Sequence, residues 1–269
     1  MHDDRPPTRA LDTSIFLRRG STARRVTLRL AVRARDDQES AARHVLSAFL
    51  RAVDAEMFGP AAPGSVPVHG ATVATERAGD LVVLSSQAAF PRMRPEGFAV
   101  LARLVEGSVP GAVALAVREE GPESSLVVRR FEPVEAESTL ADVPWQILLP
   151  ICGSPAVTVD FAEDPDWHSA HLALERLEAW IDVVRLGGFP GPGAEPFSRG
   201  ALRSWGRLGP RAVGLRLGEL ACAHHGVEAL YQALVAVHEL TPIASVSVTS
   251  GPRADRRLGA PEPLSAASA

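Results

Sequence analysis

The sequence predicts an α+β fold of two tandem ferredoxin-like (βαββαβ) units that form a pseudo-dimer. Three observations support this prediction. A pattern of roughly 130 residues occurs twice, with its landmarks in the same order. In each copy the hydrophobic periodicity follows the order strand, helix, strand, strand, helix, strand, which is that of a split βαβ unit. Hydrophobic residues make up 46% of the 269 residues, enough for a core in both units.

Four pairs of landmarks define the repeat. Each copy has a strand that leads into a helix, an aspartate near the end of that helix, a glycine that opens a second helix and a proline before the last strand. These pairs are residues 26–30 with 157–161, Asp54 with Asp182, Gly97 with Gly226, and Pro110 with Pro242. Each aspartate is followed by a similar stretch, Phe58-Gly59-Pro60 or Gly188-Phe189-Pro190. The nearly constant spacing indicates duplication, or at least one supersecondary unit used twice.

The first unit begins with a strand over residues 25–33, where apolar and polar residues alternate as in a half-buried strand. Asp36 with Glu39 fits a capping box at the start of a helix, and Gly59-Pro60 ends that helix. The remaining expected elements are a hairpin of strands 71–78 and 80–87, a helix from Pro95 to about Gly107 and a strand over 112–118.

The second unit repeats this order. A strand over 156–161 leads into a helix, for which Asp164 is the expected cap and Pro165 the expected first helical residue. The remaining expected elements are a hairpin of strands 201–208 and 211–217, a helix over 224–240 and a strand over 244–248. Two further strands, 126–131 and 145–151, lie between the units and can extend either sheet or pair with each other.

The predicted domain organisation follows from these elements. The ends of the chain are rich in proline, alanine and arginine, a composition that favours disorder. The predicted segments are a disordered arm (1–12), the first unit (13–120), a connector with extra strands (121–155), the second unit (156–251) and a disordered tail (252–269).

The composition excludes several kinds of chemistry. The chain contains no lysine, which excludes a Schiff-base lysine and the lysine of a phosphate-binding loop, and no asparagine, which excludes N-glycosylation. Its all-arginine basic residues indicate a GC-rich bacterial genome. Two cysteines argue against a disulfide scaffold. With no signal-peptide pattern and no apolar run long enough for a membrane span, we expect a cytoplasmic protein.

A metal site is the first chemical possibility. Cys222 and His224 are close in sequence, and His168 and His171 lie three residues apart near the start of a helix. These four residues could bind a metal if the two helices lie side by side. The more economical interpretation is that the histidines are helix-start residues and the cysteine a small buried apolar residue, because no metal-ligand framework of known spacing is present.

Two other groups are candidates for binding. Asp54 and Asp182 occupy matched positions, so we expect them to share a role, which is most simply an ion pair with an arginine from the sheet of the same unit. Arg203 and Arg207 belong to a series of arginines at every fourth residue, which would share one face of a strand and could bind RNA phosphates. The chain also contains 32 acidic residues, some of which must lie near these arginines, so a solvated strand face is the favoured interpretation.

No convergent reactive set is evident, and we predict neither a cofactor nor an enzymatic activity. The layout resembles that of some immunity proteins paired with bacterial toxins, in architecture only. We therefore expect a non-enzymatic protein-binding module, either a toxin-neutralising (immunity) or a regulatory protein, with a protein partner and no membrane contact. The net charge of −4 argues against nucleic acid unless a basic face is segregated.

Two alternatives remain open. The first is a small-molecule or metal-dependent enzyme of the duplicated α+β barrel type, in which His44, Asp54, His171 and Asp182 would face a cavity. The second is an RNA-binding tandem ferredoxin-like protein.

Overall fold

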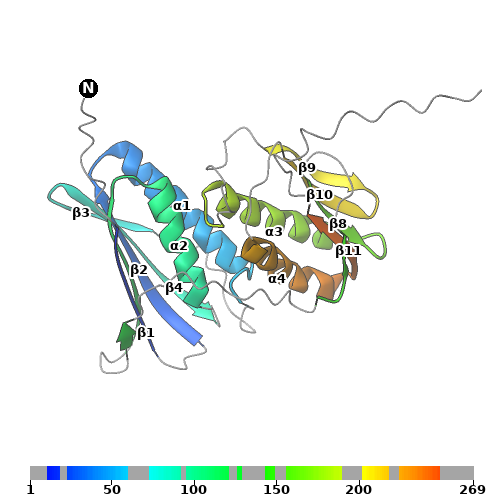
Figure 1. Ribbon diagram of the computed structural model, residues 1–269, viewed down its shortest axis with the longest axis horizontal. Helices are drawn as coiled ribbons and strands as arrows, with labels where there is room; N and C mark the ends of the chain where they lie inside the picture. Colours follow the sequence, from blue (N-terminus) through cyan, green and yellow to red (C-terminus); the bar gives the residue numbers. More distant parts are fainter. Residues whose placement is uncertain are drawn as a thin grey trace, which may run out of the picture.

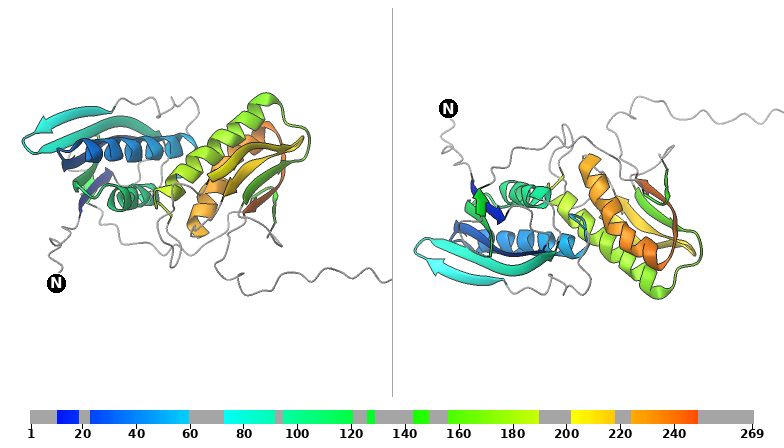
Figure 2. Two further views of the ribbon diagram at one scale, coloured as in Figure 1. Left: turned by 90° about the horizontal axis from the view of Figure 1, so that it is seen from above. Right: turned by 90° about the horizontal axis from the view of Figure 1, so that it is seen from below.

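The computed structural model describes residues 11–18, 23–59, 73–91, 95–120, 126–128, 143–148, 156–189, 202–217 and 224–248. In these residues the chain forms a mixed α+β structure with two β-sheets and four helices (Figure 1). The helices of the two halves meet in the middle of the molecule, and the two sheets lie on its outer sides (Figure 2). The arm and tail predicted at 1–12 and 252–269 lie almost entirely outside the described residues.

The first half contains one sheet and two helices. Its elements are β1 (Asp12–Arg18), β2 (Ala23–Arg33), α1 (Asp36–Asp54), β3 (Ala74–Ala78), β4 (Leu81–Pro91), α2 (Pro95–Ser108), β5 (Ala112–Glu119) and β6 (Leu126–Val128). The strand order is β3-β4-β2-β5-β1-β6. Neighbouring strands are antiparallel, except that β1 and β5 are parallel.

The second half has the same kinds of elements. They are β7 (Gln146–Leu148), β8 (Ala156–Phe161), α3 (Trp167–Arg185), β9 (Leu202–Gly209), β10 (Ala212–Leu217), α4 (His224–Leu240) and β11 (Ile243–Val248). The strand order is β7-β11-β8-β10-β9. Only β7 and β11 pair in parallel.

The two sheets can be compared strand by strand. In each sheet a hairpin (β3-β4 or β9-β10) lies beside the strand that precedes the first helix, followed by the strand after the second helix and then by an additional strand (β1 or β7). This additional strand comes before the rest of its half in the sequence and pairs in parallel with the last strand. Of these elements, β1 is not among the predicted strands, because its partner β5 lies far away in the sequence.

Two predicted helix caps are wrong by one or two residues. The N-cap of α1 is Arg35, which makes no side-chain capping bond, and Asp36 is already helical. The N-cap of α3 is Asp166, whose Oδ1 accepts a hydrogen bond from the backbone N–H of Ser169 at 2.7 Å. This backbone hydrogen bond lowers the pKa of Asp166. The acidic residues of α1 lie within its first turn and several others precede α3, and the backbone decides whether one of them is the cap.

Helices α1 and α3 end in the same kind of turn. After α3, the N–H of Gly187 donates to Val184 and the N–H of Gly188 donates to Val183, which is a Schellman motif. After α1, the N–H of Glu56 donates to Val53 in the equivalent way. Gly187 has a φ of 79° and Glu56 a φ of 60°, so Glu56 holds a left-handed conformation that a residue with a Cβ rarely adopts.

The core lies between each sheet and its helices. Along β2, alternate side chains are fully buried under the helices, and the intervening arginines are exposed on the outer face. The buried residues are Val26, Leu28, Leu30 and Val32, and the exposed ones are Arg25, Arg29 and Arg33. The alternation predicted for this strand is therefore present, with its apolar face toward the helices.

Candidate functional site

Asp54 and Asp182 both lie where the helices of the two halves meet. Arg51 of α1 donates a hydrogen bond through Nη2 to Oδ2 of Asp182 in α3, at 2.5 Å. In the opposite direction, Arg176 of α3 donates through Nη1 to the backbone carbonyl of Asp54 at the end of α1. Each half thus contributes one arginine and one aspartate to the contacts between α1 and α3.

The surroundings of these groups favour a structural role. The side chain of Asp182 is 18% exposed and that of Arg51 is 40% exposed. Burial lowers the pKa of Arg176, and the nearby carboxylates of Glu56, Asp54 and Glu175 oppose this effect. The carboxylate of Asp182 is occupied by the guanidinium of Arg51, a contact within the protein. The prediction that the arginine comes from the sheet of the same unit is wrong for Asp182, since Arg51 comes from a helix of the other half.

Aromatic residues form the apolar part of the same interface. Phe58 follows the turn after α1 and Phe189 follows the turn after α3, and their ring centroids are 6.5 Å apart. Phe58 also stacks on Phe49 at 5.7 Å, and Phe189 packs edge-on against His225 at 5.5 Å. Both phenylalanines are buried. Two positions that the sequence repeat matches are therefore in contact with each other.

The two halves also approach closely at Gly188. A Cβ built on this glycine would lie 2.6 Å from Val183 Cγ1 and 3.0 Å from Val100 Cγ1 of α2. Nearby, Ser108 at the end of α2 donates a hydrogen bond to the carbonyl of Leu186 at 3.1 Å. The glycine therefore has no room for a side chain, and the helices of the two halves pack without a gap at this point.

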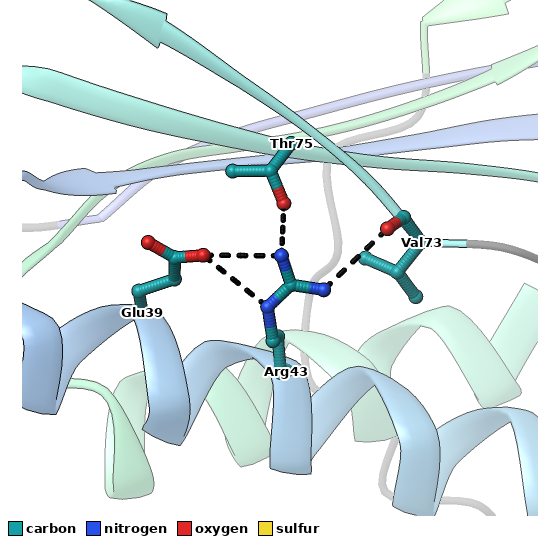
Figure 3. Close-up of polar contacts among 4 residues, drawn as sticks. All are labelled: Glu39, Arg43, Val73 and Thr75. Atoms are coloured by element: carbon teal, nitrogen blue, oxygen red, sulfur yellow. Dashed lines mark hydrogen bonds and ion pairs between the residues drawn. The ribbon is translucent and has the colours of Figure 1, made fainter.

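A second polar cluster joins α1 to the edge strand β3. Arg43 donates to Oε1 of Glu39 through both Nε (3.3 Å) and Nη2 (3.0 Å), and also to the hydroxyl of Thr75 and the carbonyl of Val73 (Figure 3). The guanidinium is thus surrounded by protein acceptors. We interpret this cluster as a clamp that holds the edge strand on the helix.

Two arginines of the series at every fourth residue contact the protein's own backbone. Arg207 is exposed and donates to the carbonyl of Pro165 at 3.0 Å, which fastens β9 to the segment before α3. Arg211 lies in the turn after β9 and donates to the carbonyl of Ala162 at 3.2 Å. Arg203 lies on β9, but its side chain is outside the described part of the structure.

The structure places the candidate metal ligands His168 and His171 at the opposite end of the α3–α4 pair from His224. His168 and His171 lie at the start of α3, beside the end of α4, where Thr241 donates to Ser169. His224 begins α4 at its other end, where the indole N–H of Trp180 donates to the carbonyl of Gly226 at 2.7 Å. The two helices are antiparallel, so these ends are separated by most of a helix length.

Cys222 lies outside the described residues. His171 itself stacks on Trp167 with the ring centroids 4.8 Å apart, and its Nε2 lies 3.4 Å from Oε1 of Glu175. Among the residues that the structure describes, no three histidine, cysteine, aspartate or glutamate side chains are grouped as a metal site requires. The set expected to face a cavity does not converge either, because His44 and His171 are exposed.

Exposed apolar residues are the feature that the sequence analysis missed. In the described chain, the large apolar side chains with the greatest exposure all belong to the second half. They are Trp167 (75%), Leu240 (54%), Trp205 (53%), Leu208 (39%) and Ile147 (36%). The sequence does indicate exposure at these positions, because Trp167 is the first residue of a helix and Trp205 lies on a strand at the edge of its sheet. Only burial distinguishes these tryptophans from Trp180, which is fully buried.

Four of these residues lie on neighbouring segments at one end of the second half. Arg207, between Trp205 and Leu208, binds the carbonyl of Pro165, which precedes Trp167 by two residues. Thr241, next to Leu240, donates to Ser169 at 2.8 Å. We call Trp167, Trp205 and Leu240 the distal apolar patch; Leu208 is not included, because its Cδ1 lies against Gly214 on the outer face of the sheet, whereas Trp205 pairs with the inward-facing Leu215. It lies at the start of α3, whereas the contacts with the first half lie toward the end of this helix.

Comparisons with known proteins give no relationship from which a function can be inferred. No protein-family model matches the chain, and no curated protein matches it significantly in sequence. Within the described residues, no helix has the length and apolar character needed to cross a membrane.

Proposed function

We propose that the chain consists of two tandem ferredoxin-like units that clasp each other as a pseudo-dimer through their helices. The shared strand order, the shared turn after α1 and α3 and the contact between Phe58 and Phe189 support this arrangement. In a two-fold interface, equivalent residues meet on the axis and other contacts occur in reciprocal pairs. The two phenylalanines fit the first condition, and so do Arg51 and Asp182, each of which lies three residues before the last residue of its helix. The contact of Arg176 with Asp54 has no reciprocal counterpart, because Val45 occupies the place in α1 that Arg176 occupies in α3.

This packing determines which surfaces remain for a partner. The helical layers cover each other, so the accessible surfaces are the outer faces and edges of the sheets and the ends of the units. The charged side chains at the centre, Arg51, Arg176 and Asp182, are occupied by contacts within the protein. We therefore propose a non-enzymatic protein-binding module, in which the duplicated core presents surfaces and performs no chemistry.

The distal apolar patch is the observation that carries this proposal. Tryptophan is enriched among the residues that contribute most to protein–protein binding, and exposed apolar groups that gather in one region mark interaction sites. Trp167 and Trp205 are 75% and 53% exposed. Trp205 lies on β9, an edge strand whose outer side has no strand partner among the described residues, so a partner's strand can add to it.

The proposed partner is a protein with an apolar surface complementary to these two indoles. The protein would act in the bacterial cytoplasm as a toxin-neutralising or regulatory module. Its mild acidity and its duplicated architecture agree with this proposal, and the distal apolar patch provides the binding surface.

The experiment is an affinity purification from the native host with three forms of the full chain. These are the wild type, the double variant Trp167→Ser/Trp205→Ser and the control Arg216→Gln, which changes an exposed residue of β10. We expect one partner, in a fixed ratio to the chain, to be retained by the wild type and the control and lost by the double variant. Purified wild type and partner should then form a complex in sedimentation velocity.

Two outcomes would contradict the proposal. One is a partner that is retained equally by all three forms, which would place the binding surface elsewhere. The other is turnover of a small substrate by the purified chain, or a metal or chromophore that co-purifies with it, which would favour the enzymatic alternative. The Tm of the double variant should equal that of the wild type, which would show that any loss of binding does not result from unfolding.

A further inference from the structure

The outer face of the first sheet carries a row of exposed arginines. Arg25, Arg29 and Arg33 lie on β2 at every fourth residue, so they share one face and are about 14 Å apart in succession. None of the three forms an ion pair or a side-chain hydrogen bond with any described residue. Arg207 and Arg43 differ in this respect, because both bind acceptors of the protein itself.

The residues beside Arg29 are small. On the neighbouring strands Arg29 pairs with Ser85 of β4 and with Ala116 of β5, and Ala116 pairs in turn with Ser14 of β1. Residues directly paired across strands point to the same side of a sheet. Arg29 is therefore flanked by short side chains on the neighbouring strands, so an extended ligand can lie across the sheet at this point.

An aromatic residue lies on the same face. Thr27 of β2 pairs with Arg118 of β5, which pairs with Phe16 of β1. Arg118 is exposed, and Phe16 is partly exposed, whereas its neighbours Ile15 and Leu17 are buried on the other face. The sequence gives no sign of this grouping, because Phe16 and the arginines belong to strands that only the sheet brings together. An aromatic side chain therefore lies beside the arginines of the first sheet.

We propose that this arginine face, defined as Arg25, Arg29, Arg33, Arg118 and Phe16, binds single-stranded RNA. The arginines would contact phosphates, and Phe16 would stack with a base, as aromatic residues on sheet surfaces do in single-strand recognition. This inference goes beyond the proposed function and concerns the other half of the chain, so either can fail without the other.

The distribution of acidic residues on this face agrees with the proposal. Its acidic residues are Asp12 of β1 and Glu76 of β3, which lie toward the two edges of the sheet, and Glu120 just after the end of β5, whose N–H donates to the carbonyl of Arg25. The residues paired directly with Arg29 are not acidic. Arginines therefore outnumber acidic residues on this face, although the chain as a whole has a net charge of −4. Charge alone would equally suit an acidic peptide, and Phe16 is the reason to favour RNA.

The test measures binding of a fluorescein-labelled oligouridine by fluorescence anisotropy between about 50 mM and 200 mM salt. Three arginine–phosphate contacts predict a slope of log K against log salt of about −2, which corresponds to a loss of affinity of about 18-fold over this range. The variant Arg29→Gln should reduce the slope by about 0.7, so that the loss becomes about 7-fold. Arg216→Gln, which changes an exposed arginine on the second sheet, should leave the slope unchanged.

Phe16→Leu separates stacking from charge. This variant keeps an apolar side chain on the sheet, and we expect it to lower the affinity about five-fold or more at every salt concentration without changing the slope. The proposal is overturned if oligouridine does not bind at low salt, if Arg29→Gln and Arg216→Gln behave alike, or if polyglutamate competes as well as polyuridine. The last result would identify an acidic protein as the ligand.

Discussion

The pair Arg51–Asp182 should stabilise the folded chain measurably, because it joins the two halves. Its atoms are 2.5 Å apart, and the side chains are 40% and 18% exposed. Fully exposed pairs contribute about 0.2–1 kcal/mol, and breaking a fully buried pair costs about 3–5 kcal/mol. After allowance for solvent screening of the exposed arginine, we expect a coupling free energy of about 1–2 kcal/mol between the two side chains. In a chain of this size, each kcal/mol lowers Tm by about 2–4 °C.

The measurement is a double-mutant cycle of Arg51→Gln, Asp182→Asn and the double variant, by urea unfolding followed with circular dichroism. The control is the pair His171–Glu175 on the same helix, whose side chains are 48% and 58% exposed and whose coupling should stay below about 0.5 kcal/mol. If the coupling of Arg51 and Asp182 is no larger than that of the control, the contact does not hold the halves together. Loss of partner binding in Asp182→Asn without a change in stability would instead assign the aspartate to a binding site.

Three further predictions concern local features. Gly214→Ala should destabilise the second half by about 2–3 kcal/mol in urea unfolding, because the new Cβ would lie 2.2 Å from the carbonyl oxygen of Val157; an unchanged midpoint would show that β10 can shift. Asp166→Ala should lower Tm near neutral pH, and the difference from wild type should fade below about pH 3.9. Folding lowers the pKa of the Asp166 carboxyl, so this group stabilises the folded chain above its unfolded pKa and loses the contribution as the pH falls. A Tm difference that persists in acid would refute the capping role of Asp166. Two of the four tryptophans are buried and two are exposed, so acrylamide should quench the fluorescence in two distinct components, and a single component would contradict this burial.

Local patterns were sufficient to predict most elements of each half. The helix over 224–240 has the predicted bounds, and β5, β10 and β11 differ from the expected strands by a single residue. These elements are specified by short-range periodicity and by turn residues such as Gly79, whose φ is 64°. The coarse class, a mixed α+β chain, follows from them.

The candidate surfaces were not predictable from the same patterns. Whether a tryptophan is buried like Trp180, whose indole N–H donates to Gly226 of α4, or exposed like Trp167 depends on which other segments pack against its helix. Similarly, Phe16 joins the arginines of β2 only through its pairing with β5. Both properties depend on contacts between residues that are distant in the sequence, for which periodicity carries no information.

The sequence by itself determined most of the elements and their order, because hydrophobic periodicity and turn chemistry act over a few residues. The tertiary structure alone decided that the halves meet through their helices. Only this packing brings Arg51 to Asp182 and Phe58 to Phe189. Burial and charge pairing are properties of surfaces that form when distant segments come together, so they are settled by the packing and not by any local stretch of the chain.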